Sequence, residues 1–438
     1  MLRQAKRRTR AARGAWRRRV ATLIGAVVLG LVALLFAWLG DYVQRAFALA
    51  AVSWPYAPLF LTPAVFAAVV FATRKIAPTA RGSGIPQVIA AARHPARAVE
   101  TTLCSLRTAI VKISLTLGML AAGASVGREG PTVQVSAAIM VAAHRMLRVP
   151  LTAGVLLAGG AAGVAAAFNT PLAGVAFAIE ELAAAYEQRV AVLVMAAVVI
   201  AGFVSLGVAG DYVYFGAMGE HLSVGSALAI IPVVGVIGGL AGASFSRAML
   251  WFAAGGGRIP AWCKAHPVLG AAICGLVVAA AGVATHGLTW GTGYGPTKTL
   301  VEGREGDWLF GSAKFIATLA TAVSGAPGGI FAPSLAVGAG IGGAIASFFS
   351  SAPPGAVVVL GMAAYFVGVV RAPLTAVIIL SETTVSRGVI LPLFATALIA
   401  DGVARLVGRE RLYHGLSHGF ISDEGLKEQE ELRKDLRA

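Results

Sequence analysis

The chain has 438 residues, of which 57% are hydrophobic and only 13% carry a charge. Soluble domains carry about 25% charged residues, so this composition excludes an ordinary water-soluble protein. The net charge of +16 could suggest a nucleic-acid-binding protein, but nine of the first 19 residues are Arg or Lys and an apolar run follows at once. This is the positive-inside signature, so we expect a basic arm, residues 1–19, in the cytoplasm and no nucleic-acid partner.

Uncharged runs follow this arm along much of the chain. A helix that crosses a bilayer needs roughly 20 apolar residues, and each of these runs reaches that length: 20–40, 151–179, 190–210, 222–246 and 315–370. Gly and Pro interrupt many apolar stretches, and broken backbone survives in lipid only where protein or a wet cavity surrounds it. The sequence therefore predicts an all-α integral membrane protein whose helices are partly discontinuous.

The sequence also repeats itself with an offset of 202 residues. The offset places Gly130-Pro131 on Ala332-Pro333, Gly159 on Gly361, Ala161-Ala162 on Ala363-Ala364, Pro171-Leu172 on Pro373-Leu374, and Glu180 on Glu382. A looser pair, Gly82–Pro86 and Gly291–Pro296, needs a shifted register. We interpret the chain as two membrane repeats, 20–209 and 222–408, followed by the end of the last helix and a charged cytoplasmic tail, 409–438. The repeat alone leaves open whether the two halves are parallel or inverted.

Three Gly/Pro-rich breaks interrupt apolar sequence at Gly82–Pro86, Gly127–Pro131 and Gly325–Pro333, and each precedes a stretch that begins like a helix. Helix starts leave backbone N–H groups unpaired and carry a partial positive charge. Several starts that converge would bind an anion weakly enough to release it, whereas a fixed Lys or Arg would hold it. The alternative is that these breaks are ordinary loops at the membrane surface.

Ionisable residues within apolar sequence are functional candidates, because they are expensive to bury in a membrane. Glu129 lies inside the second break, where its carboxylate would compete with an anion for the same N–H groups and would leave when protonated. Glu180 and Glu181 point about 100° apart on a helix, so either both mark the end of a span or one faces the protein interior. Lys112 is either a buried cation or a lysine that reaches the interface from a span end.

Cysteine and histidine spacing predicts no metal site. Cys104, Cys263 and Cys274 form no CxxC pair, and His414 and His418, four residues apart, are best interpreted as a solvated helix face. An intramembrane serine protease using Ser83 and His286 is disfavoured, because His286 lies in no recognisable motif. We therefore expect neither an enzyme nor a cofactor.

Three ordered signatures resemble those of the CLC chloride channel and transporter family: Gly82-Ser83-Gly84-Ile85-Pro86, Gly127-Arg128-Glu129-Gly130-Pro131 and Gly329-Ile330-Phe331-Ala332-Pro333. The stretch Ala165–Glu181 is similar to the bacterial branch. The resemblance implies the CLC fold, with two inverted repeats of many tilted helices, and a homodimer with one ion pathway per subunit. It implies a chloride/proton antiporter in the cell membrane (the inner membrane if Gram-negative) with both termini cytoplasmic. The alternative is a passive voltage- or pH-gated chloride channel of the same fold.

The resemblance also assigns expected roles to individual residues. The Ser83 hydroxyl, the Ile330 and Phe331 amides and the Tyr413 hydroxyl would hold the central chloride. Amides around Arg128–Gly130 and Phe331–Ala332, and so residues Arg128, Gly130 and Ala332, would form an outer site. Glu129 matches the gating glutamate, which also takes up external protons, and Glu181 matches the glutamate that passes protons to the cytoplasmic side. Ser83 matches members that prefer chloride, whereas those with Pro there prefer nitrate.

Two residues depart from the family pattern. Gln87 stands where many relatives have Glu, and Ile89 replaces a carboxylate that partners the lysine matching Lys112 in some relatives. A buried Lys112 would therefore lack its usual counter-charge, and an unpaired buried ammonium is costly.

Overall fold

The computed structural model describes residues 2–95, 100, 102–182, 188–210, 215–216, 222–349, 352–384 and 388–421. The regular elements in these ranges are helices, and β pairing is limited to two isolated bridges. Six described segments are long and apolar enough to cross a membrane: Arg13–Ser53, Pro58–Ile76, Ala191–Ala209, Val224–Ala254, Pro267–Ala284 and Ile390–Val407. The predicted all-α architecture is therefore confirmed.

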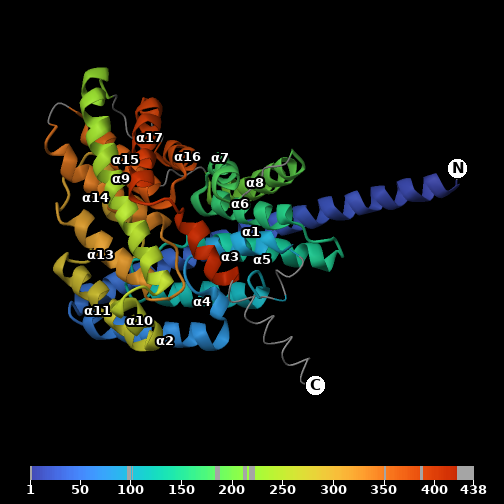
Figure 1. The fold of residues 1–438 in the computed structure, drawn as a ribbon, viewed down its shortest axis with the longest axis horizontal. Helices are drawn as coiled ribbons and strands as arrows, with labels where there is room; N and C mark the ends of the chain where they lie inside the picture. Colours follow the sequence, from blue (N-terminus) through green and yellow to red (C-terminus); the bar gives the residue numbers. More distant parts are fainter. Residues whose placement is uncertain are drawn as a thin grey trace.

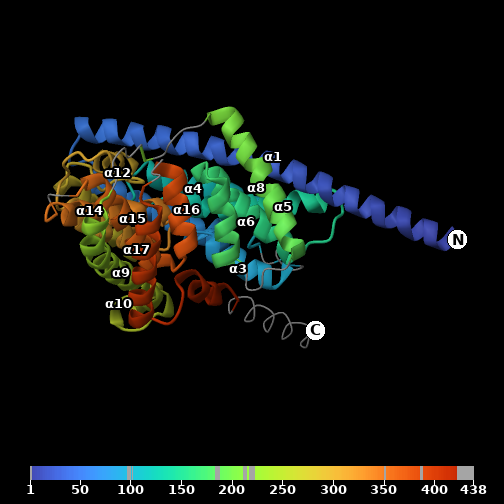
Figure 2. The ribbon, with the colours of Figure 1, turned by 90° about the horizontal axis from the view of Figure 1, so that it is seen from above.

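The N-terminal helix α1 (Leu2–Ser53) runs along one side of the body, and its N-terminal part projects beyond the other helices (Figures 1 and 2). The basic residues expected in an arm, 1–19, form the start of this helix from Leu2 onwards.

The remaining elements fall into two series. The first contains α2 (Pro58–Ile76), η1 (Pro78–Ala80), α3 (Ile85–Arg93), α4 (Leu106–Leu120), α5 (Glu129–Met146), α6 (Ala153–Phe168), α7 (Pro171–Phe177), η3 (Ala178–Leu182) and α8 (Gln188–Ala209). The second contains α9 (Val224–Ala254), α10 (Arg258–Ala265), α11 (Pro267–Ala284), α12 (Tyr294–Val301), α13 (Phe310–Val323), α14 (Phe331–Ala346), α15 (Pro354–Val370), α16 (Pro373–Thr384) and α17 (Ile390–Val407). Residues 412–421 are helical, and residues 422–438 of the expected tail lie outside the described chain.

Equivalent helices of the two repeats are separated by the predicted 202 residues. The first residues of α5 and α14, numbers 129 and 331, differ by 202. Helices α6 and α15 end in left-handed residues that are also 202 apart, Asn169 with φ 56° and Arg371 with φ 63°. Helices α3 and α12 need the shifted register, and they follow Gly84 and Gly293, whose φ angles of 106° and 85° favour glycine.

Two equivalent glutamates show that the repeats are inverted. Glu180, just past α7, accepts hydrogen bonds from the backbone N–H groups of Leu374 and Thr375 at the start of α16, at 2.9 and 2.6 Å. Glu382, near the end of α16, accepts from two backbone N–H groups at the start of α7, at 3.2 and 2.9 Å. Each helix therefore ends beside the start of its equivalent, so α7 and α16 run antiparallel. Equivalent helices of a parallel repeat would run in the same direction.

The short central helices are enclosed by protein. All residues of α6 from Gly154 and of α15 from Gly355 are buried. Helix α5 packs on α6 as α14 packs on α15, whereas α17 at the periphery exposes large apolar side chains such as Leu391 and Leu406. The apolar outer faces are compatible with contact to lipid. The inner elements can be short and broken because protein surrounds them.

The crossed contacts of Glu180 and Glu382 can be tested by removing one charge at a time. Hydrogen bonds to charged groups contribute about 1.5–3 kcal/mol, and Gln retains only one acceptor oxygen. We expect Glu180→Gln and Glu382→Gln each to lower the free energy of unfolding by about 1–2 kcal/mol, measured on detergent-purified protein. Glu305→Gln, on an exposed stretch of chain, is the matched control. Transitions indistinguishable from that control would contradict this account.

Candidate functional site

The Gly/Pro-rich breaks meet inside the protein. Gly127 and Gly329 exchange two backbone hydrogen bonds, each 2.8 Å long. Gly82 donates to the carbonyl oxygen of Ala326 at 3.2 Å and accepts from the amide of Gly328 at 3.0 Å. Because Gly127 and Gly329 are buried, the second and third breaks do not meet at a loop on the membrane surface.

The starts of α3, α5 and α14 lie together at this meeting point. A Cβ atom on Gly130, in the first turn of α5, would be 3.1 Å from the carbonyl oxygen of Ser83 and 3.2 Å from Cα of Gly329. Such a close approach favours glycine at position 130. First-turn N–H groups lack acceptors within their own helix, so the structure gathers the amide donors of several helix starts.

A cavity of about 510 Å³ reaches the same point, and Ser83, Ile330 and Tyr413 line it. Tyr413 is fully buried, with its ring centroid 6.0 Å from that of Phe331. No hydrogen-bond partner for the Tyr413 hydroxyl is present in the described part of the chain, so this group is available to a ligand. The four residues expected to surround a central anion are thus brought together.

The Glu129 carboxylate occupies the start of α14. Its Oε2 atom accepts from the amide of Ala332 at 3.4 Å, and its Oε1 atom accepts from the Tyr294 hydroxyl at 2.5 Å. The side chain is fully buried. Tyr294 was not predicted, although it lies in Gly291–Pro296, the segment that matches the first break in a shifted register.

The Arg128 side chain contacts α1. Its Nη1 atom donates to the carbonyl oxygen of Ala37 at 2.5 Å and to Asp41 Oδ1 at 2.7 Å. These contacts tie the turn that carries Glu129 and Gly130 to α1. Asp41 was not predicted, and its only signal is a carboxylate directly after the first uncharged run.

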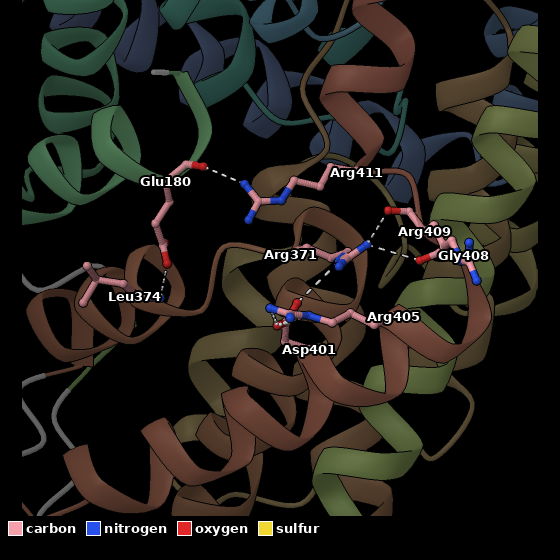
Figure 3. Close-up of polar contacts among 8 residues, drawn as sticks. All are labelled: Glu180, Arg371, Leu374, Asp401, Arg405, Gly408, Arg409 and Arg411. Atoms are coloured by element: carbon pink, nitrogen blue, oxygen red, sulfur yellow. Dashed lines mark hydrogen bonds and ion pairs between the residues drawn. The ribbon is translucent and has the colours of Figure 1, made fainter. Parts of the chain in front are cut away.

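Figure 3 shows how the segment that leads into Tyr413 is held in place. Arg411 Nη1 donates to the carbonyl oxygen of Glu180 at 2.8 Å. Arg371 contacts the preceding stretch and the end of α17, through Gly408 O at 3.2 Å, Arg409 O at 3.0 Å and Asp401 Oδ1 at 3.4 Å.

The adjacent glutamates have different surroundings, as one of the two alternatives predicted. Glu180 caps α16, whereas Glu181 is fully buried with its Oε1 atom 3.5 Å from His414 Nδ1. The interpretation of the two histidines as a solvated face holds for His418, whose side chain is 61% exposed. It holds only in part for His414, whose side chain is 31% exposed and lies against Glu181.

The Lys112 side chain is fully buried and does not reach the membrane interface. Its Nζ atom donates to the carbonyl oxygens of Ala80 at 2.8 Å and Gly82 at 2.6 Å. The Gln87 amide donates to two further carbonyls of the same loop. Backbone carbonyl oxygens thus accept the Lys112 hydrogen bonds where some relatives have a carboxylate. Lys314, 202 residues later, makes an equivalent pair of contacts before α12.

Helix starts that gather amide donors around a buried glutamate, inside a bundle of membrane-length helices, are typical of a membrane ion-transport protein. The chain belongs to the voltage-gated chloride channel family, whose profile matches residues 64–405. It is 34% identical over 432 residues to the H(+)/Cl(-) exchange transporter ClcA of Yersinia pestis bv. Antiqua (strain Angola), covering 91% of this chain and 86% of that protein.

Solved structures share the fold. The chain superposes on a slow cyanobacterial Cl⁻/H⁺ antiporter with a TM-score of 0.80 and 23% identity, covering 93% of this chain and 99% of the other. A CLC-type fluoride/proton antiporter gives a TM-score of 0.73 at 20% identity, covering 91% and 97%. The predicted CLC fold is therefore confirmed.

Proposed function

We infer that this protein is a chloride/proton antiporter. Relatives of similar sequence are named H(+)/Cl(-) exchange transporters. The main support for this proposal is the hydrogen bond of 3.4 Å from the Ala332 amide to the Glu129 carboxylate. An anion that binds this amide must displace the carboxylate, and a displaced carboxylate is free to take a proton. One group thereby couples the two ions.

The central chloride binds between the Ser83 hydroxyl, the amides of Ile330 and Phe331, and the Tyr413 hydroxyl. These donors are dipoles and not full charges, so the ion can leave again. The Lys112 amine donates to the carbonyl oxygens of Ala80 and Gly82 and so supports the loop that carries Ser83. The outer site uses the amides of Arg128, Gly130 and Ala332.

Protons reach the cytoplasmic side through Glu181, which is buried near the end of η3. Transient water between Glu181 and Glu129 carries the proton across the gap. A passive channel has no use for a buried carboxylate at position 181, and this favours the antiporter over the channel.

The remaining expectations follow from family membership and composition. The protein is a multi-pass protein of the cell membrane, with both termini in the cytoplasm and the basic start of α1 on that side. It works as a homodimer with a separate pathway in each subunit. Its substrates are chloride and protons; it uses no cofactor and catalyses no covalent reaction.

Liposome flux tests the proposed function directly. An outward chloride gradient, with no pH gradient imposed, should drive protons into liposomes that contain the wild-type protein. We expect Glu129→Gln and Glu181→Gln to reduce this proton entry at least about tenfold while chloride efflux continues, because each removes a proton acceptor. Glu305→Gln is the control. Chloride efflux without proton entry in the wild type would indicate the channel.

The hydrogen bond from Tyr294 should stabilise the Glu129 carboxylate at the start of α14. Loss of one hydrogen bond to Glu129 should let chloride compete better, so we expect Tyr294→Phe to raise chloride affinity roughly three- to tenfold in titration calorimetry. In a Glu129→Ala background the same change should have no effect. Tyr365→Phe is the matched control, because Tyr365 is buried and its hydroxyl has no partner among the described residues. Equal gains in both backgrounds would contradict the idea.

A further inference from the structure

The Glu181 carboxylate has no direct access to water. Its side chain is 0% exposed, and neither carboxylate oxygen accepts a hydrogen bond within the described residues. A neighbouring side chain that reaches solvent would therefore give protons a route between this group and the cytoplasm.

Glu180, the adjacent residue, is not suited to pass that proton. One of its carboxylate oxygens accepts from the Leu374 amide at 2.9 Å, and the other accepts from the amide and the hydroxyl of Thr375 at 2.6 and 2.7 Å. Both oxygens are thus committed to the start of α16, and protonation would break this cap.

His414 is placed between Glu181 and solvent. Its Nδ1 atom lies 3.5 Å from Glu181 Oε1, and its side chain is 31% exposed. Two hydrogen bonds hold the backbone around His414. The Ser417 hydroxyl donates to the carbonyl oxygen of His414 at 2.7 Å, and the Gly415 amide donates to the carbonyl oxygen of Arg411 at 2.9 Å.

The charged groups that face Glu181 are few. Among the described residues, the charged or titratable groups near Glu181 are His414, Arg411 and Tyr413 on the C-terminal segment, and Glu180 on η3. Arg411 donates to a backbone carbonyl and does not release protons at physiological pH. Imidazole is the side chain that exchanges protons with water near neutral pH.

We propose that His414 is the proton relay between the cytoplasm and Glu181. This rests on the proposed function, and it adds a residue that the sequence pattern had placed on a solvated face. The protonated ring gives its Nδ1 proton to Glu181 Oε1 and becomes neutral, while the carboxylate becomes a carboxylic acid. The neutral ring then rotates toward water and takes up another proton. Proton release from Glu181 into the cytoplasm follows the same steps in reverse.

The relay is tested by measuring chloride and proton flux together in liposomes that contain full-length protein. We expect His414→Ala to lower proton flux about tenfold or more and to raise the ratio of chloride to protons moved. Free imidazole added on the cytoplasmic side should restore proton flux in His414→Ala but not in Glu181→Gln. His418→Ala is the matched control: it lies one turn further along, and its side chain is 61% exposed beside Glu410.

The outcomes separate the relay from the proposed function. A wild type that moves chloride without protons would refute the antiporter. A coupled wild type whose coupling persists in His414→Ala would refute only the relay. If His414→Ala does not fold, as judged by size-exclusion chromatography, His414→Gln replaces it, because Gln keeps a polar side chain but cannot relay protons at neutral pH. Failure of imidazole to restore proton flux in a folded variant would also refute the relay.

Discussion

The two hydrogen bonds exchanged by Gly127 and Gly329 hold the starts of α5 and α14 against each other inside the protein. A side chain at position 329 would crowd this pairing, and one at position 127 would displace the Glu129 carboxylate. A Cβ atom on Gly329 would lie 3.0 Å from the carbonyl oxygen of Gly127, and one on Gly127 would lie 2.3 Å from Glu129 Oε2. Because the backbone pairs here, neighbouring helix starts keep their first-turn amides close together, and this gathers partial positive charge without a fixed cation.

The two repeats share the same supporting contacts but differ in the side chains at the candidate site. Lys112 and Lys314 hold equivalent loops, and Glu180 and Glu382 cap equivalent helices across the interface. At the site itself the halves differ. Glu129 begins α5, whereas Phe331 begins α14 at the equivalent position. The symmetric contacts thus build the frame, and the unequal residues give it a carboxylate on one side only.

Much of this frame was predictable from the sequence. The 202-residue offset, the Gly/Pro breaks and the family signatures placed Ser83, Glu129 and the start of α14 in one site before any geometry was available. The inverted orientation came only from the resemblance, since a linear repeat does not encode direction. In the structure it follows from the crossed caps of Glu180 and Glu382.

The missed features depend on contacts between distant segments. Asp41 reaches Arg128 across 87 positions, and Tyr294 reaches Glu129 across 165. No short pattern records such pairs. Lys112 lacks a carboxylate partner in the sequence pattern, and the backbone carbonyl oxygens that accept its hydrogen bonds cannot be identified from a sequence. His414 looked solvated because helical spacing does not say which neighbour covers a face.

Anomalous diffraction from bromide-soaked crystals tests the central claim most directly. The account predicts a bromide peak in contact with the Ser83 and Tyr413 hydroxyls and the amides of Ile330 and Phe331. It also predicts a second peak at the Ala332 amide when Glu129 is replaced by Gln. Well-ordered crystals with no bromide among these groups, in wild type and variant alike, would contradict it.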